Sequence, residues 1–189
     1  MKGDISDESD IDQVNLVLQG DVTQDHFSRV SVADLDNNGN MEIVVSTSKL
    51  GTGGDGYLFA TERNEILWWV DVDEKWTFTL GYPIEAQPSL GNVDSNKRKE
   101  VVFGLTNGTL FVLNISADGR DVSVKWTYTV DEKYSPTYGD NIRGELGYTA
   151  IADIDFDGKN EIIFADSQPG IPDWDADLYV LEKLKGDAL

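Results

Sequence analysis

The chain has 189 residues, of which 40% are hydrophobic, and it carries a formal net charge of −20 and no cysteine. This length and apolar content allow a buried core, whereas the acidity excludes a basic surface for a nucleic acid or an anionic membrane, so we expect no nucleic-acid partner. The lack of cysteine excludes disulfide bonds and metal sites built on thiolates.

The N-terminal part of the chain consists of an acidic tail, residues 1–13, followed by a short apolar segment at residues 14–22. Within that segment, Val14 to Leu18 alternate as a β-strand does, but they belong to no complete repeat. We expect this strand to complete a last sheet. The chain has neither a secretory signal pattern at its first residues nor a stretch approaching the roughly 18 apolar residues of a membrane span, so we expect no membrane span.

Three repeats of about 60 residues follow, at residues 23–74, 75–133 and 134–189. In each repeat a strand leads into an acidic loop, and a second, largely β-branched strand follows. We expect these second strands to be covered on both faces. They lie at residues 43–45, 101–103 and 162–164. Third strands are predicted at residues 56–60, 108–112 and 177–181.

A fourth strand that carries tryptophan is predicted in the first two repeats, at residues 66–70 and 122–126. Trp68 and Trp126 lie 58 residues apart, and we expect both to pack in the core. The third repeat ends before a fourth strand, which leaves an open edge. Four other aromatic residues lie in predicted connecting segments, where we expect a contact surface. They are Trp76, Tyr134, Tyr138 and Trp174.

The acidic loops carry the functional signal. Loop 1 is residues 34–42, loop 2 is residues 92–100 and loop 3 is residues 153–161, each numbered from position 1 to position 9. The first residues of successive loops are 58 and 61 positions apart. Oxygen donors at positions 1, 3, 5 and 9, with a backbone carbonyl at position 7, form the ligand set of a hard cation such as Ca²⁺.

Loops 1 and 3 are the predicted calcium sites, because glycine at position 6 permits a sharp left-handed bend. The predicted ligands of loop 3 are Asp153, Asp155, Asp157, the carbonyl of Lys159 and Glu161. The predicted ligands of loop 1 are Asp34, Asp36, Asn38, the carbonyl of Asn40 and Glu42. The alternative is an aspartate-rich hairpin turn without an ion, since Asp, Asn and Gly favour turns by themselves.

Loop 2 is a degenerate version of the same pattern. Its oxygen donors are Asn92, Asp94, Asn96 and Glu100, and Lys97 replaces the glycine. We expect Lys97 to adopt an unfavourable backbone conformation, at a cost of about 1 kcal/mol. We also expect the positive charge of a cation to come from residues 97–99, so a metal ion in this loop is doubtful.

The loop residues resemble the FG-GAP type of β-propeller repeat, found in integrin α-subunits and many prokaryotic surface proteins. The family pattern Asp-x-Asp-x-Asp-Gly-x-x-Asp/Glu is matched in full by Asp153–Glu161, and the resemblance covers roughly residues 27–189. The third strands and the tryptophans of the fourth strands that follow them are also similar to quinoprotein-like blades. This resemblance implies four-stranded antiparallel blades with calcium in their loops.

The predicted fold is therefore all-β, with propeller-type blades that are too few to close alone, because propellers have about four to eight blades. Two arrangements remain open. The chain is either part of a longer array or a subunit that assembles edge to edge, with the strand Val14–Leu18 of one copy on the open third repeat of another.

The predicted function is that of a non-enzymatic, calcium-stabilised repeat module for adhesion, interaction or assembly at a cell surface or in the extracellular space, where it would contact a protein or a glycan. The alternative is part of a carbohydrate-active enzyme, because some polysaccharide lyases resemble this family in using calcium-loaded propellers. In that case carboxylates would act as acid and base.

Overall fold

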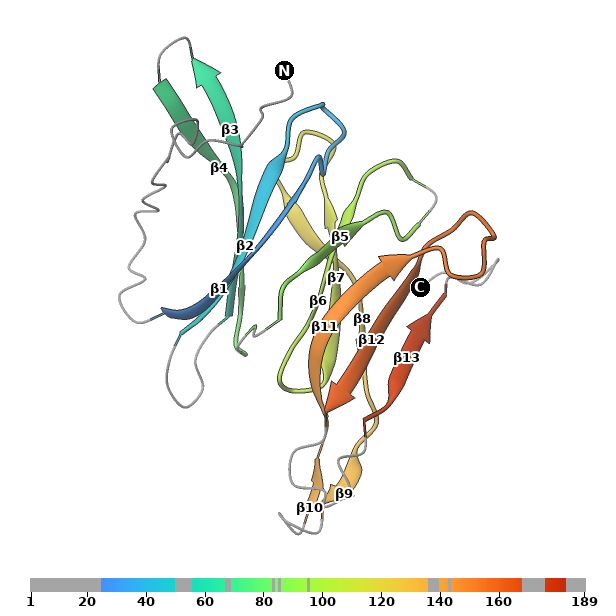
Figure 1. The fold of residues 1–189 in the computed structure, drawn as a ribbon. Coiled ribbons are helices and arrows are strands. Elements are labelled where there is room, and N and C mark those ends of the chain that lie inside the picture. The colour runs from blue at the N-terminus through green and yellow to red at the C-terminus, as the bar shows by residue number, and fades with distance from the viewer. Residues whose placement is uncertain are drawn as a thin grey trace, which may run out of the picture.

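The computed structural model describes residues 25–49, 56–66, 69–82, 84, 86–94, 96–135, 140–142, 144–167 and 176–182. These residues form β-strands and no helix, which confirms the all-β prediction for the described part of the chain (Figure 1). No helix long and apolar enough to cross a membrane occurs among them. The predicted strand at Val14–Leu18 lies outside the described residues.

The strands form three antiparallel sheets, each following chain order, and one small hairpin. Sheet 1 contains β1 (Asp25–Ala33), β2 (Glu42–Lys49), β3 (Gly56–Ile66) and β4 (Trp69–Leu80). Sheet 2 contains β5 (Ser89–Gly91), β6 (Glu100–Gly104), β7 (Thr109–Ile115) and β8 (Val122–Thr129). Sheet 3 contains β11 (Glu145–Ala152), β12 (Glu161–Ser167) and β13 (Leu178–Leu181). The hairpin, absent from the sequence prediction, pairs β9 (Lys133–Ser135) with β10 (Asp140–Ile142).

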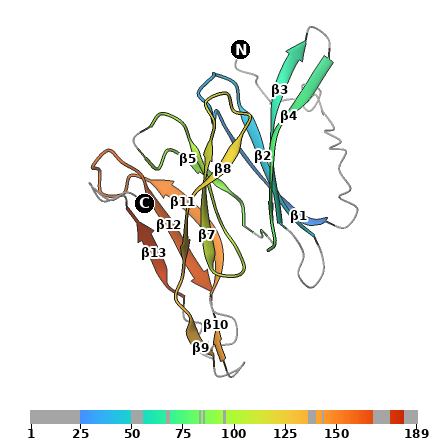
Figure 2. The same cartoon turned by 180° about the vertical axis from the view of Figure 1, so that it is seen from behind.

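Sheet 2 lies between sheets 1 and 3, as the two opposite views show (Figures 1 and 2). One apolar cluster joins sheets 1 and 2 and includes Val44, Leu58 and Phe103. A second cluster joins sheets 2 and 3 and includes Val112 and Phe164. The apolar side chains that alternate along the strands therefore pack one sheet on the next. The sheets do not close into a ring within the described residues.

The second strands are not equally covered. All five residues of β6 are buried, because sheet 2 has a neighbour on each face. In β2 only Val44 of the predicted 43–45 run is buried, and in β12 Ile163 is only half-buried. The expectation of cover on both faces is therefore met in the middle sheet and not in the two flanking sheets, each of which packs against one neighbour in the described structure.

The fourth strand of sheet 1 differs from the prediction. In β4, Trp76 pairs with Ala60 of β3, just as Trp126 of β8 pairs with Val112 of β7. Trp76 is 5% exposed, so the prediction that it belongs to a connecting segment is wrong. Trp68, the residue paired with Trp126 from sequence, lies outside the described residues.

The physical reason is a difference in hairpin length. Strands β3 and β4 have 11 and 12 residues, whereas β7 and β8 have 7 and 8, so a constant spacing cannot hold through the hairpin. The repeated hexapeptides that do correspond are KWTFTL at residues 75–80 and KWTYTV at residues 125–130. Residues 75–80 thus lie in sheet 1, although the expected boundary between the first two repeats fell after residue 74.

The first strands of the three sheets lie side by side and are joined by a repeated hydrogen bond. The hydroxyl of Ser31 donates to the Pro88 carbonyl at 2.5 Å, and the hydroxyl of Ser89 donates to the Thr149 carbonyl at 2.5 Å. These strands line an open groove of about 520 Å³. The stacking brings the acidic loops that follow the first strands close to one another.

Candidate cation-binding loops

Each acidic loop joins the first and second strands of its sheet. The residue at position 1 follows the last residue of β1, β5 or β11, and the glutamate at position 9 begins β2, β6 or β12. In Figure 1 the three loops lie at the same side of the stacked sheets. Hairpin formation therefore places the repeated oxygen donors at corresponding points of the three sheets.

The glutamate at position 9 is buried and held in the same way in every loop. Its Oε2 atom accepts a hydrogen bond from the backbone N–H at position 2. The pairs are Leu35 and Glu42 at 2.7 Å, Val93 and Glu100 at 3.0 Å, and Ile154 and Glu161 at 2.8 Å. The glutamates are exposed by 1%, 0% and 2%, respectively. Because a buried carboxylate is costly without a compensating charge, each of them favours a cation nearby.

Loop 3 has a carboxylate oxygen that lacks such compensation within the described residues. Oε1 of Glu161 is buried and has no hydrogen-bond partner there. Oxygens of Asp153, Asp155 and Glu161 lie within 4.8 Å of one another. Carboxylates this close repel each other unless a positive charge lies between them. The acidic group of loop 3 could therefore hold a metal ion.

Loops 1 and 3 are folded by the same backbone bonds. In loop 3 the carboxylate of Asp153 accepts from the N–H groups of Asp157 at 3.1 Å and Gly158 at 3.0 Å. In loop 1 the carboxylate of Asp34 accepts from the two corresponding N–H groups, both at 3.1 Å. The glycines at position 6 have φ of 94° in loop 1 and 89° in loop 3, the left-handed conformation that the sequence predicted.

Loop 1 also brings together one oxygen each from Asp34, Asp36 and Glu42 within 4.8 Å. The side chain of Asn38 donates to Asp36 at 3.1 Å and accepts from the N–H of Asn40 at 2.7 Å. The residues at positions 1, 3 and 9 therefore form the same compact group in loops 1 and 3, with an amide in place of a carboxylate at position 5.

Asp157 of loop 3 is placed differently from the other predicted ligands. A carboxylate oxygen of Asp157 lies within 4.8 Å of oxygens of Asp155 and of Glu182, which follows β13. Asp157 is not part of the group that contains Asp153 and Glu161. The ammonium of Lys159 pairs with Asp157, and the N–H of Lys159 donates to the same carboxylate at 2.8 Å. The hydrogen bond to Asp157 raises the pKa of Lys159.

Loop 2 folds in another way, because position 1 is an amide. The side chain of Asn92 donates to the carbonyl of Asn96, and its oxygen accepts from the N–H of Asp94 at 3.0 Å. Among the described non-glycine residues, positive φ angles occur at Asn37 and Phe156 and not at Lys97. The expectation of a strained backbone at Lys97 is therefore wrong, since loop 2 does not make the bend that glycine permits in loops 1 and 3.

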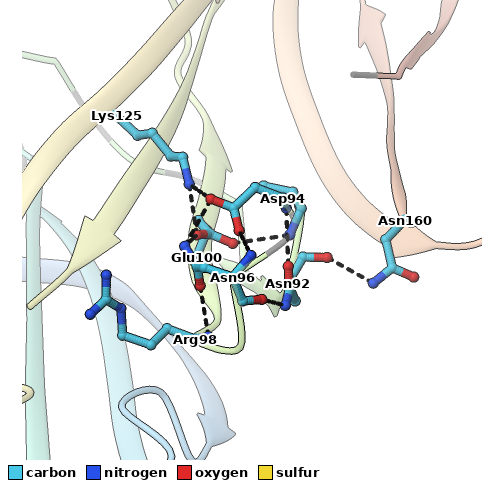
Figure 3. A network of polar contacts seen from close by, with 8 residues as sticks. Asn92, Asp94, Asn96, Arg98, Glu100, Lys125 and Asn160 are labelled. Atoms are coloured by element: carbon cyan, nitrogen blue, oxygen red, sulfur yellow. Dashed lines mark hydrogen bonds and ion pairs between the residues drawn. The ribbon is translucent and has the colours of Figure 1, made fainter. Parts of the chain in front are cut away.

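A lysine from outside the loop lies among the carboxylates of loop 2 (Figure 3). The ammonium of Lys125, on β8, pairs with Asp94 and with Oε1 of Glu100, the latter at 2.9 Å. The side chain of Lys125 is 22% exposed. Burial alone would lower the pKa of Lys125, but hydrogen bonds to Asp94 and Glu100 outweigh it and the pKa is raised. The ammonium is thus charged at neutral pH.

The positive charge that the structure shows at loop 2 comes from Lys125, whereas residues 97–99 were its predicted source. The ammonium of Lys99 donates to the carbonyl of Asp34 in loop 1 at 2.6 Å, and the backbone N–H of Arg98 donates to Asn96 at 2.7 Å. Position 8 of loop 3 makes the same kind of contact, because Asn160 donates to the carbonyl of Asn92 at 2.7 Å. Position 8 therefore joins loop 2 to loop 1 and loop 3 to loop 2.

Sequence reasoning missed Lys125 because its place in the loop depends on the pairing of β7 with β8. One signal could have found it: lysine precedes tryptophan in both repeated hexapeptides, as Lys75–Trp76 and Lys125–Trp126. The half-buried Lys75 is thus the counterpart of Lys125 in sheet 1.

Comparison of the chain with protein-family models, with curated proteins and with solved structures gave no match. The candidate site is therefore defined by the geometry of the loops. That geometry consists of acidic groups in loops 1 and 3 that could hold a metal ion, and a corresponding group in loop 2 that contains a lysine.

Proposed function

We propose that the chain is a calcium-stabilised, FG-GAP-like β-propeller repeat module, with Ca²⁺ in loops 1 and 3. The observation that carries this proposal is at Glu161, whose Oε1 is buried with no hydrogen-bond partner among the described residues and whose carboxylate belongs to a group with Asp153 and Asp155. Ca²⁺ is the proposed ion because all the donors are oxygens on short loops, and Ca²⁺ tolerates irregular geometry.

The role of the ion in this proposal is structural. Each loop contacts the next through position 8, so an ion that holds loop 1 or loop 3 also stabilises the edge along which the sheets meet. The chain then acts as a non-enzymatic module for adhesion, interaction or assembly at a cell surface or in the extracellular space. Extracellular calcium modules bind with dissociation constants of about 0.1 to 1 mM, in a setting where the ion is abundant.

Thermal melting with and without calcium tests the proposal. Free calcium at ten to a hundred times the dissociation constant adds about 1.4 to 2.7 kcal/mol per site, which is about 3 to 10 °C for a chain of this size. We expect the midpoint to rise by this amount per occupied loop when chelator is replaced by about 10 mM calcium. An unchanged midpoint contradicts the proposal.

Two substitutions identify the loop that produces the shift. Asp155→Asn removes one carboxylate of the loop 3 group and reduces the calcium-dependent shift, leaving the part due to loop 1. Asp131→Asn changes an exposed aspartate between β8 and β9 and leaves the shift intact. Equal shifts in both variants would mean that calcium acts outside loop 3.

The non-enzymatic part of the proposal has its own assay. In a polysaccharide lyase, carboxylates would act on a sugar chain and leave unsaturated ends. Incubation of the chain with acidic polysaccharides is expected to produce no such ends, and their appearance in proportion to the protein would support the alternative function.

A further inference from the structure

We propose that the ammonium of Lys125 is the resident cation of loop 2, so that loop 2 needs no metal ion while Lys125 is in place. This inference deepens the proposed function, because it takes the cation sites of loops 1 and 3 as the reference. It concerns a residue outside the loop, on β8, that reaches the loop from the side (Figure 3).

The placement of the ammonium is the first argument. The glutamate at position 9 is fixed in all three loops by the same backbone hydrogen bond through Oε2, and in loop 2 its Oε1 contacts the ammonium of Lys125. In loop 3, the oxygens at positions 3 and 9 belong to one group within 4.8 Å. In loop 2, the ammonium of Lys125 contacts the carboxylates at these same two positions, Asp94 and Glu100. Lysine therefore lies where an ion would contact both.

The charge of the loop is the second argument. Loop 2 has two carboxylates at its donor positions, whereas loop 1 has three and loop 3 has four. A single positive charge is a closer match to two carboxylates than to four, and divalent-ion affinity depends on the number of charged ligands. The loop with the fewest carboxylates is the loop that holds an ammonium, as this comparison of charges predicts.

Burial is the third argument. Glu100 is 0% exposed, and Lys125 supplies its positive partner. Removing one member of a buried ion pair leaves the other uncompensated. Without the lysine, the carboxylates of Glu100 and Asp94 would lose the positive charge that both contact, and a divalent cation is expected to take its place.

The experiment is the substitution Lys125→Met, which keeps the aliphatic chain and removes the ammonium. In chelator we expect the melting midpoint to fall by about 5 to 10 °C, because Glu100 loses its partner. At millimolar free calcium, equilibrium dialysis is expected to show two ions per chain in the native protein and three in the variant. Calcium is then expected to raise the melting midpoint of the variant by more than it raises that of the native protein.

Lys75→Met is the matched control, because Lys75 precedes Trp76 as Lys125 precedes Trp126. Loop 1 is already a proposed ion site, so this variant is expected to gain no ion. Adding Asp94→Asn to Lys125→Met is expected to abolish the third ion. An unchanged ion count in Lys125→Met, with the same calcium-dependent shift as the native protein, overturns the proposal.

A second arm does not depend on calcium binding by the native protein. In chelator, Lys125→Met is combined with Glu100→Gln, which removes the buried charge that the lysine compensates. The proposal predicts that the double variant melts above Lys125→Met alone. Additive losses of stability in the double variant would show that the ammonium does not act through Glu100, and they would overturn the inference. If Lys125 and Glu100 are coupled but the native protein binds no calcium, only the proposed function is overturned.

Discussion

At the scale of single residues, Glu161 has two roles with opposite effects on stability. Its Oε2 atom holds the backbone of Ile154, whereas its Oε1 atom is buried without a partner among the described residues. The first role stabilises the hairpin in every condition. The second is unfavourable until a cation binds, because an uncompensated buried charge is costly.

Substitution of Glu161 by Gln separates these roles. The amide oxygen can still accept from Ile154, but the negative charge is gone. We expect Glu161→Gln to be neutral or stabilising in chelator and to cost about 1 to 3 kcal/mol in millimolar calcium, the range for loss of a buried interaction with a charged group. Denaturant unfolding in both conditions measures this change of sign. The same loss in chelator as in calcium would exclude a cation at Oε1.

The predictable part of the site is the part encoded locally. The bends at Gly39 and Gly158 follow from glycine at a fixed position of a short loop, and the structure has both. Lys125 lies 25 residues from Glu100 in the sequence and meets it only through the pairing of β7 with β8. A loop pattern read along the chain contains no information on that contact.

At the scale of elements, sheets 2 and 3 approach each other closely at a glycine. A Cβ atom added to Gly104 on β6 would lie 2.4 Å from Cβ of Leu146, which is shorter than any normal contact. Gly104 is therefore required by packing between two elements and not by a special backbone angle.

We expect Gly104→Ala to reduce the free energy of unfolding by about 1 to 3 kcal/mol, the usual cost of overpacking a core. Gly81→Ala is the matched control, since an added Cβ there has no atom within 4 Å. Chemical denaturation of both variants measures the difference. Equal stability of the two variants would mean that sheets 2 and 3 can separate at this point without cost.

The strands themselves were predictable from alternation and β-branching, but the correspondence between repeats was only partly so. The acidic loops and the second strands keep the same spacing from repeat to repeat because the loop that joins the first and second strands has the same length in each sheet. The hairpin of β3 with β4 is longer than that of β7 with β8, so Trp76 and not Trp68 corresponds to Trp126. When two paired strands are both lengthened, the alternation of apolar and polar residues along each strand is unchanged, so the sequence pattern does not reveal the insertion.

At the scale of the whole molecule, the three sheets stack through equivalent faces. Leu58 of sheet 1 and Leu110 of sheet 2 are fully buried against the next sheet, whereas the corresponding Leu178 of sheet 3 is 71% exposed. Periodicity predicts which residues form such a face, because it depends on alternation along one strand. What packs on the face depends on other segments, so alternation alone cannot predict it.

We propose that the three loops hold different cations: a divalent ion in loops 1 and 3, and the ammonium of Lys125 in loop 2. A crystal structure determined in millimolar calcium, with anomalous scattering measured at a long wavelength, tests this most directly. We expect anomalous peaks beside Glu42 and Glu161 and none beside Glu100, where the lysine remains in contact. Empty loops 1 and 3, or a peak between Asp94 and Glu100 with Lys125 displaced, would contradict it.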